Sequence, residues 1–88
     1  MKIKSGFVAR SVGGNRIVLA TGERSKRFGG MIRLNESAGV LWDRLMEESD
    51  RAGLIAALLD EYDVDEATAT ADVDAFLNTL REAGVLDE

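Results

Sequence analysis

The spacing of hydrophobic and polar residues changes about one third of the way along the chain. The first third holds two runs rich in β-branched residues, 7–12 and 16–21, with Gly13-Gly14-Asn15 between them. Glycine and asparagine tolerate the positive φ angles of a tight turn. This pattern predicts two antiparallel strands joined as a hairpin.

A short apolar run follows the loop formed by residues 22–30. Met31, Ile32, Arg33 and Leu34 predict a third strand, because Ile32 and Leu34 would share one face while Met31 and Arg33 share the other. In a meander of three strands, the third lies at an edge of the sheet.

The rest of the chain has the spacing of three amphipathic helices. Apolar residues recur at relative positions 0, 3, 4 and 7 in three sets: Ala38, Leu41, Trp42 and Leu45; Ile55, Leu58, Leu59 and Tyr62; Val73, Phe76, Leu77 and Leu80. The predicted N-caps are Asn35, Asp50 and Asp65, and Gly84 is the predicted C-terminal glycine.

These elements give the order βββααα and place the chain in the α+β class. Three amphipathic helices have to cover one another and one face of a three-stranded sheet. We therefore expect residues 1–88 to form a single domain of the winged helix-turn-helix type, with the wing ahead of the helices.

Composition narrows the chemistry. The 88 residues include no cysteine, which excludes a disulfide and a thiolate nucleophile, and no histidine, which removes the commonest general base and the commonest transition-metal ligand. Phosphate-binding and dinucleotide motifs are also missing. We expect neither catalysis nor a cofactor nor a bound metal. The sequence shows no membrane span and no signal peptide, so a cytoplasmic location is expected.

Charge is divided unevenly along the chain. Residues 1–35 carry eight Lys and Arg and one acid, a net charge of +7, whereas residues 36–88 carry three Arg and fifteen acids, a net charge of −12. The basic part, including Arg24, Lys26 and Arg27 of the loop, would either attract an acidic partner or remain a solvated surface.

Several segments together resemble one known family. They are Gly30-Met31-Ile32-Arg33-Leu34-Asn35-Glu36-Ser37-Ala38 followed by Leu41-Trp42; Leu58-Leu59-Asp60-Glu61-Tyr62-Asp63-Val64-Asp65; Ala71-Asp72-Val73-Asp74-Ala75-Phe76-Leu77; and Leu80-Arg81-Glu82-Ala83-Gly84-Val85-Leu86. In order and spacing they resemble PqqD-like proteins, the recognition elements for ribosomally made, post-translationally modified peptides. The loop 22–29 is less typical of the family.

The resemblance implies a non-enzymatic peptide chaperone. Such domains bind the leader segment of a precursor peptide beside the third strand and the third helix, and present it to a separate maturation enzyme such as a radical enzyme, a protease or a cyclase. Carried over by position, the peptide-binding residues are Met31, Ile32, Arg33, Leu34, Val73, Phe76, Leu77 and Leu80.

Each of these residues also has a purely structural interpretation. Ile32 and Leu34 suit the core as well as a contact, and Met31 and Arg33 would touch either ligand or solvent. We expect two of the four residues on the third helix to reach the cleft. Trp42 is expected in the core.

Two other functions compete with peptide binding. A winged helix-turn-helix suggests nucleic-acid binding, but the third helix carries five acids and one arginine over residues 65–83, which would repel phosphate. The exposed strand edge could instead pair with a second copy and give a homodimer.

Overall fold

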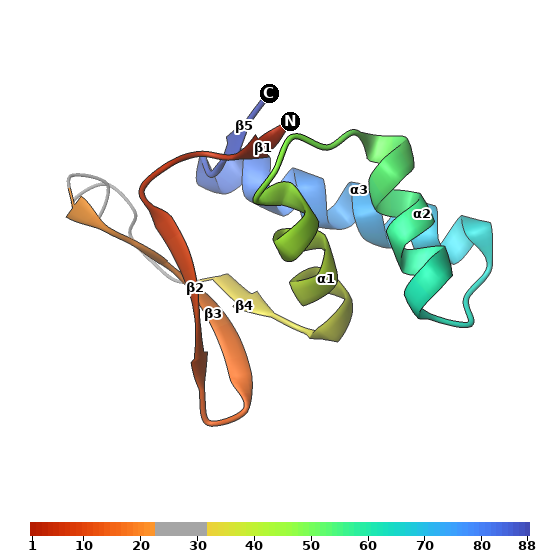
Figure 1. Cartoon of the computed structure of the whole chain (residues 1–88), viewed down its shortest axis with the longest axis horizontal. Helices are drawn as coiled ribbons and strands as arrows, with labels where there is room; N and C mark the ends of the chain where they lie inside the picture. Colours follow the sequence, from red (N-terminus) through yellow and green to blue (C-terminus); the bar gives the residue numbers. More distant parts are fainter. Residues whose placement is uncertain (23–31) are drawn as a thin grey trace.

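The structure, a computed structural model, describes residues 1–22 and 32–88 (Figure 1). Along this part of the chain the elements are β1 (Lys2–Ile3), β2 (Phe7–Val12), β3 (Asn15–Ala20), β4 (Ile32–Leu34), α1 (Glu36–Leu45), α2 (Arg51–Glu61), α3 (Glu66–Ala83) and β5 (Leu86–Asp87). Strands β2, β3 and β4 form an antiparallel sheet in that order, and the three helices follow. The predicted α+β class and βββααα order are confirmed.

The β2–β3 hairpin forms where the glycines predicted it. Gly13 and Gly14 have φ angles of +57° and +84°. Two consecutive positive φ angles are what a two-residue turn between twisted strands requires. Val12 pairs with Asn15 next to this turn, and the tip of the hairpin extends away from the helices (Figure 1).

Local side-chain chemistry sets the helix ends. The N-cap carboxylate or amide oxygens of Asn35, Asp50 and Asp65 accept hydrogen bonds from the backbone N–H groups of Ala38, Gly53 and Thr68, at 2.9, 2.7 and 2.7 Å. Gly84 ends α3 in the left-handed conformation, with φ of 73°. All four predicted caps are confirmed.

One core joins the inner face of the sheet to all three helices. Val18 and Leu34 contribute from the sheet, and Trp42, Leu58 and Leu77 contribute from α1, α2 and α3. All five side chains are at most 4 % exposed. Trp42 is therefore a core residue, as expected.

The apolar stripe predicted for α2 is only partly correct. The residues that α2 fully buries are Leu54, Ala57 and Leu58. Of the predicted stripe, Leu58 is buried, and Ile55 and Tyr62 are partly buried and pack against the core. Leu59 is 40 % exposed. The sequence offers two apolar stripes that share Leu58, and only the packing of α2 against α1 and α3 selects between them.

The two ends of the described chain meet in a small sheet that the sequence did not predict. Lys2 pairs with Asp87 and Ile3 with Leu86, and the Lys4 N–H donates to the Val85 carbonyl at 2.8 Å. The pairing places both termini side by side at the end of α3 (Figure 1). Two-residue strands are too short to show an alternating pattern.

Candidate functional site

Strand β4 has only one paired edge within the part of the chain that the structure describes. It pairs with β3 in the register Arg16↔Leu34, Ile17↔Arg33 and Val18↔Ile32, and it ends the strand order β2-β3-β4. An edge strand presents N–H and C=O groups that a further strand can pair with. This edge is therefore a candidate for strand addition.

A groove of about 420 Å³ lies between this strand and α3. It is lined by Asn15, Ile32, Arg33, Leu34, Asn35, Ser37, Ala38, Leu41, Asp72, Ala75, Phe76 and Thr79. Strand β4 forms one wall, α3 forms the opposite wall, and the start of α1 closes the floor. The strand edge and the groove together can take one extended segment, with its backbone on β4 and alternate side chains in the groove.

The helix wall is a second stripe of α3. Asp72, Ala75, Phe76 and Thr79 lie at relative positions 0, 3, 4 and 7, so they share one face of the helix. Three of the four predicted helix residues, Val73, Leu77 and Leu80, are at most 1 % exposed and belong to the core.

Phe76 belongs to both stripes of α3. It is 8 % exposed, it packs in the core cluster, and it also lines the groove. Among the described residues it is thus the single member of the predicted helix set that reaches the groove, where two were expected. Its ring forms an apolar surface of the groove against which a ligand side chain can pack.

The strand wall contains three of the four residues predicted for it. Leu34 is buried beneath the groove, Ile32 is half-buried at the margin of the core, and Arg33 is exposed. Met31 lies outside the described residues. The same is true of Arg24, Lys26 and Arg27, which the sequence suggested for electrostatic steering.

Several groove residues were not predicted from the sequence. They are Asn15, Asn35, Ser37, Ala38, Leu41, Asp72, Ala75 and Thr79. The sequence assigned Asn35 to a helix cap and Ala38 and Leu41 to the apolar stripe of the first helix, and the other five residues are small or polar. The 0, 3, 4, 7 spacing that Asp72, Ala75 and Thr79 share with Phe76 could have indicated a second face.

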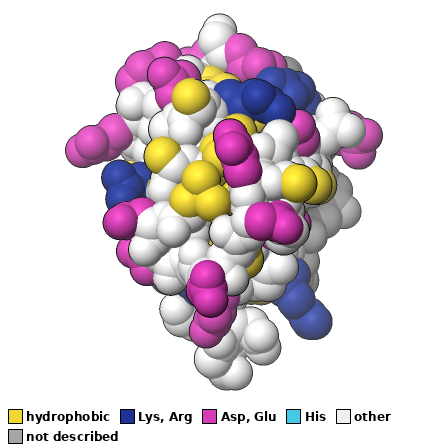
Figure 2. Space-filling model, turned by 90° about the vertical axis from the view of Figure 1, so that its right-hand side faces the viewer, with side chains coloured by type: hydrophobic (Ala, Val, Ile, Leu, Met, Phe, Trp, Pro, Cys, Tyr) yellow, Lys and Arg dark blue, Asp and Glu magenta, His cyan; other side chains and the backbone are white. Residues whose placement is uncertain are grey.

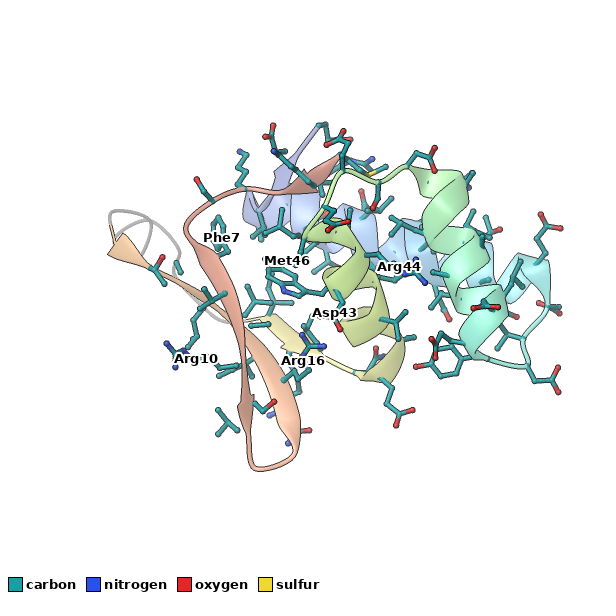
Figure 3. The ribbon with its side chains drawn as sticks, viewed as in Figure 1. Phe7, Arg10, Arg16, Asp43, Arg44 and Met46 are labelled. Carbon is teal, nitrogen blue, oxygen red and sulfur yellow. The ribbon has the colours of Figure 1, made fainter. Side chains whose placement is uncertain are left out.

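Polar contacts between the sheet and α1 hold the strand wall in place. The Arg16 guanidinium donates to the Asp43 carboxylate at 2.9 and 3.3 Å and to the Gly39 carbonyl at 3.3 Å (Figure 3). The hydrogen bond to the Asp43 carboxylate raises the pKa of Arg16 above its ordinary value. Because Arg16 is paired with Leu34 in the sheet, these hydrogen bonds fix β4 relative to α1.

The Asn35 side chain shapes the step from β4 into α1. Its Oδ1 accepts from the Ala38 N–H at 2.9 Å and from the Ser37 hydroxyl at 3.2 Å. The turn therefore places Ser37 and Ala38 at the floor of the groove.

The charged groups of the groove stand on opposite walls. Arg33 lies on β4 and Asp72 on α3, and both side chains are exposed. Neither forms an ion pair or side-chain hydrogen bond with another described residue. Both charges are thus available to a bound molecule.

Within the described ranges, no group of three or more carboxylate-bearing residues converges as metal ligands would. The Ser37 hydroxyl donates its hydrogen bond to the Asn35 amide oxygen at 3.2 Å. None of the helices in residues 1–22 and 32–88 combines the length and hydropathy needed to cross a membrane.

The sequence also matches a known family. Residues 16–86 match the model of Coenzyme PQQ synthesis protein D (PqqD), and this chain belongs to the PqqD family. The resemblance identified from the sequence segments is thereby confirmed.

Two solved structures share the fold. One is TbiB1 in complex with the TbiA(beta) leader peptide, which is 24 % identical, with a TM-score of 0.78 over 99 % of this chain and 95 % of that one. The other is lasso peptide synthetase B1 complexed with the leader peptide, which is 21 % identical, with a TM-score of 0.75 over 96 % of this chain and 93 % of that one. Among curated proteins, none matches this sequence significantly.

Proposed function

We propose that this protein is a peptide chaperone without catalytic activity, which binds the leader segment of a ribosomally made precursor peptide and delivers it to a separate modifying enzyme. One observation carries the proposal: the edge of β4 that is not paired with any described residue lies beside the groove between β4 and α3. Family membership supports it, as do two chains of the same fold that were solved with leader peptides.

The energetics favour a ligand that combines backbone pairing with apolar side chains. A net main-chain hydrogen bond contributes only about 1 kcal/mol, so the three residues of β4 are not enough for a stable complex. Burial of one apolar side chain adds about 1.5–3 kcal/mol before ordering costs. Ile32, Ala38 and Phe76 offer such contacts in the groove, and a Kd in the micromolar range follows.

Binding without chemistry agrees with the groups present in the groove. The whole sequence has no histidine or cysteine. The charged groove residues, Arg33 and Asp72, come from opposite walls. The chemistry would thus belong to the partner, for which the family resemblance supports a radical enzyme, a protease or a cyclase. A cytoplasmic location fits a ligand made by ribosomes.

Charge on the helices weakens the nucleic-acid alternative. The face formed by α2 and the start of α3 shows many acidic side chains around exposed apolar ones (Figure 2). On α3 the Arg81 guanidinium is bound to Glu88 at 2.9 Å, and Asp74 to Arg51 of α2 at 2.7 Å. Phosphate would meet repulsion where the recognition helix of a DNA-binding protein needs cations.

The proposal is tested by filling the groove without touching the core. Ala75 is exposed and lines the groove, so the indole of Ala75→Trp would occupy the space of a ligand side chain. We expect fluorescence anisotropy of labelled candidate leader peptides to show at least a tenfold loss of affinity.

Ala67→Trp is the matched control, since Ala67 is exposed on the same helix and does not line the groove. It should bind as the wild type does. Equal affinity of Ala75→Trp and Ala67→Trp would show that the peptide binds elsewhere. Light scattering of the free and bound protein would show whether self-pairing of the β4 edge competes with the peptide.

A further inference from the structure

The outer face of the sheet carries a row of residues that ends at the β4 edge. Arg10 pairs with Ile17, and Ile17 pairs with Arg33, so these three side chains lie side by side on the face opposite the helices. Neighbouring strands are about 4.8 Å apart. A strand added to β4 would continue this row and place one of its side chains directly beside Arg33.

The neighbouring side chains of such a strand would point the other way. Side chains of a strand alternate between its two faces. The residues before and after the one beside Arg33 would therefore project to the inner face, where Ile32 and Leu34 lie and where α3 forms the opposite wall. There they would meet Phe76 and Asp72.

The charged residues on the two walls would have opposite electrostatic effects on an acidic side chain of the ligand. Arg33 would attract an acidic side chain on the outer face, and both its exposure and its lack of a partner among the described residues leave it available. Asp72 would repel an acidic side chain that points inward. Like charges placed opposite one another are unfavourable, and opposite charges are favourable.

We infer that the groove selects a leader segment in which an acidic residue stands between two apolar residues, and that Arg33 and Asp72 together set the register of the bound strand. A slip of one residue would move every side chain to the other face. The acid would then leave Arg33 and approach Asp72, while an apolar residue would be exposed on the outer face. This inference rests on the proposed function and adds the chemical class of the ligand.

A library of random twelve-residue peptides displayed on phage tests the inference, because selection from it does not require the leader sequence. The wild type should enrich Asp or Glu flanked by apolar residues. Arg33→Glu should enrich Lys or Arg at the same central position, and Asp72→Lys should admit acids at the flanking positions. Circular dichroism checks that each variant is folded.

A synthetic pair of peptides gives the size of the effect. For an enriched peptide, replacement of the central acid by Lys should weaken binding to the wild type about fivefold, and Arg33→Glu should reverse the preference. If the wild type enriches no peptide, the proposed function fails. If Arg33→Glu keeps the acidic preference of the wild type, the register inference is overturned while strand addition stands.

Discussion

The two stripes of α3 differ in what they contact, although both repeat with the same helical spacing. Val73, Leu77 and Leu80 are enclosed in the core. Asp72, Ala75 and Thr79 are exposed and face the groove. The first stripe holds the helix in the fold, and the second lines the groove to which we assign the ligand. The comparison shows that an apolar stripe locates the core side of a helix, whereas the proposed site lies on the stripe beside it.

Phe76→Ala should have the largest effect, because Phe76 belongs to both stripes. Removal of a buried phenylalanine costs about 3–5 kcal/mol of unfolding free energy. The same change removes an apolar wall of the groove. We expect urea denaturation to show the loss of stability, and anisotropy under conditions where the protein is folded to show weaker peptide binding. Unchanged affinity would assign Phe76 to the core alone.

Leu77→Ala should reduce stability without reducing peptide binding, because Leu77 belongs only to the core stripe of α3. Leu77 is 1 % exposed and does not line the groove. We expect a loss of about 2–5 kcal/mol in the free energy of unfolding. The affinity per folded molecule should remain close to that of the wild type. A loss of affinity as large as that of Phe76→Ala would contradict the division of α3 into two faces.

Thr79→Ala should reduce peptide binding without reducing stability, because Thr79 belongs only to the stripe of α3 that lines the groove. Thr79 is exposed, and its hydroxyl donates to the Ala75 carbonyl at 3.1 Å within the helix. Exposed substitutions of this kind change stability by about 0.5 kcal/mol or less. We expect a change of a few-fold in peptide affinity with an unaltered urea midpoint. Asn78→Ala, at an exposed position of the same helix outside the groove, is the control.

The smallest expected effect is a pH dependence at the start of α3. The hydrogen bonds that Asp65 accepts from Thr68 hold the pKa of its carboxylate below the ordinary value. A carboxylate with a lowered pKa in the folded state stabilises the protein above its unfolded pKa of about 3.9. That contribution is lost as the pH falls through the lower folded value.

Asp65→Asn provides the comparison, because asparagine also caps helices but does not titrate in this range. The urea midpoint of the wild type should fall more steeply than that of Asp65→Asn as the pH drops below about 4. Parallel curves for the two proteins would show that the charge of Asp65 does not contribute.

Much of the fold was predictable because its signals are local. The Gly13-Gly14 turn and the caps Asn35, Asp50 and Asp65 depend on a few neighbouring residues. The candidate site was predictable only in part. The sequence located the β4 side, with Ile32, Arg33 and Leu34, and it located α3 as the partner helix. On α3 it indicated the core stripe, with Phe76 as the only residue that the described groove shares with it.

The sequence by itself determined the order of the three main strands and the three helices, the caps of the helices, and the family. The tertiary structure decided which of two apolar stripes of α2 is fully buried, that Lys2–Ile3 pairs with Leu86–Asp87, and that Asp72 of α3 lines a groove together with β4. The physical reason is distance along the chain. Turns and caps depend on interactions within a few residues, whereas these features depend on which distant surface each element packs against.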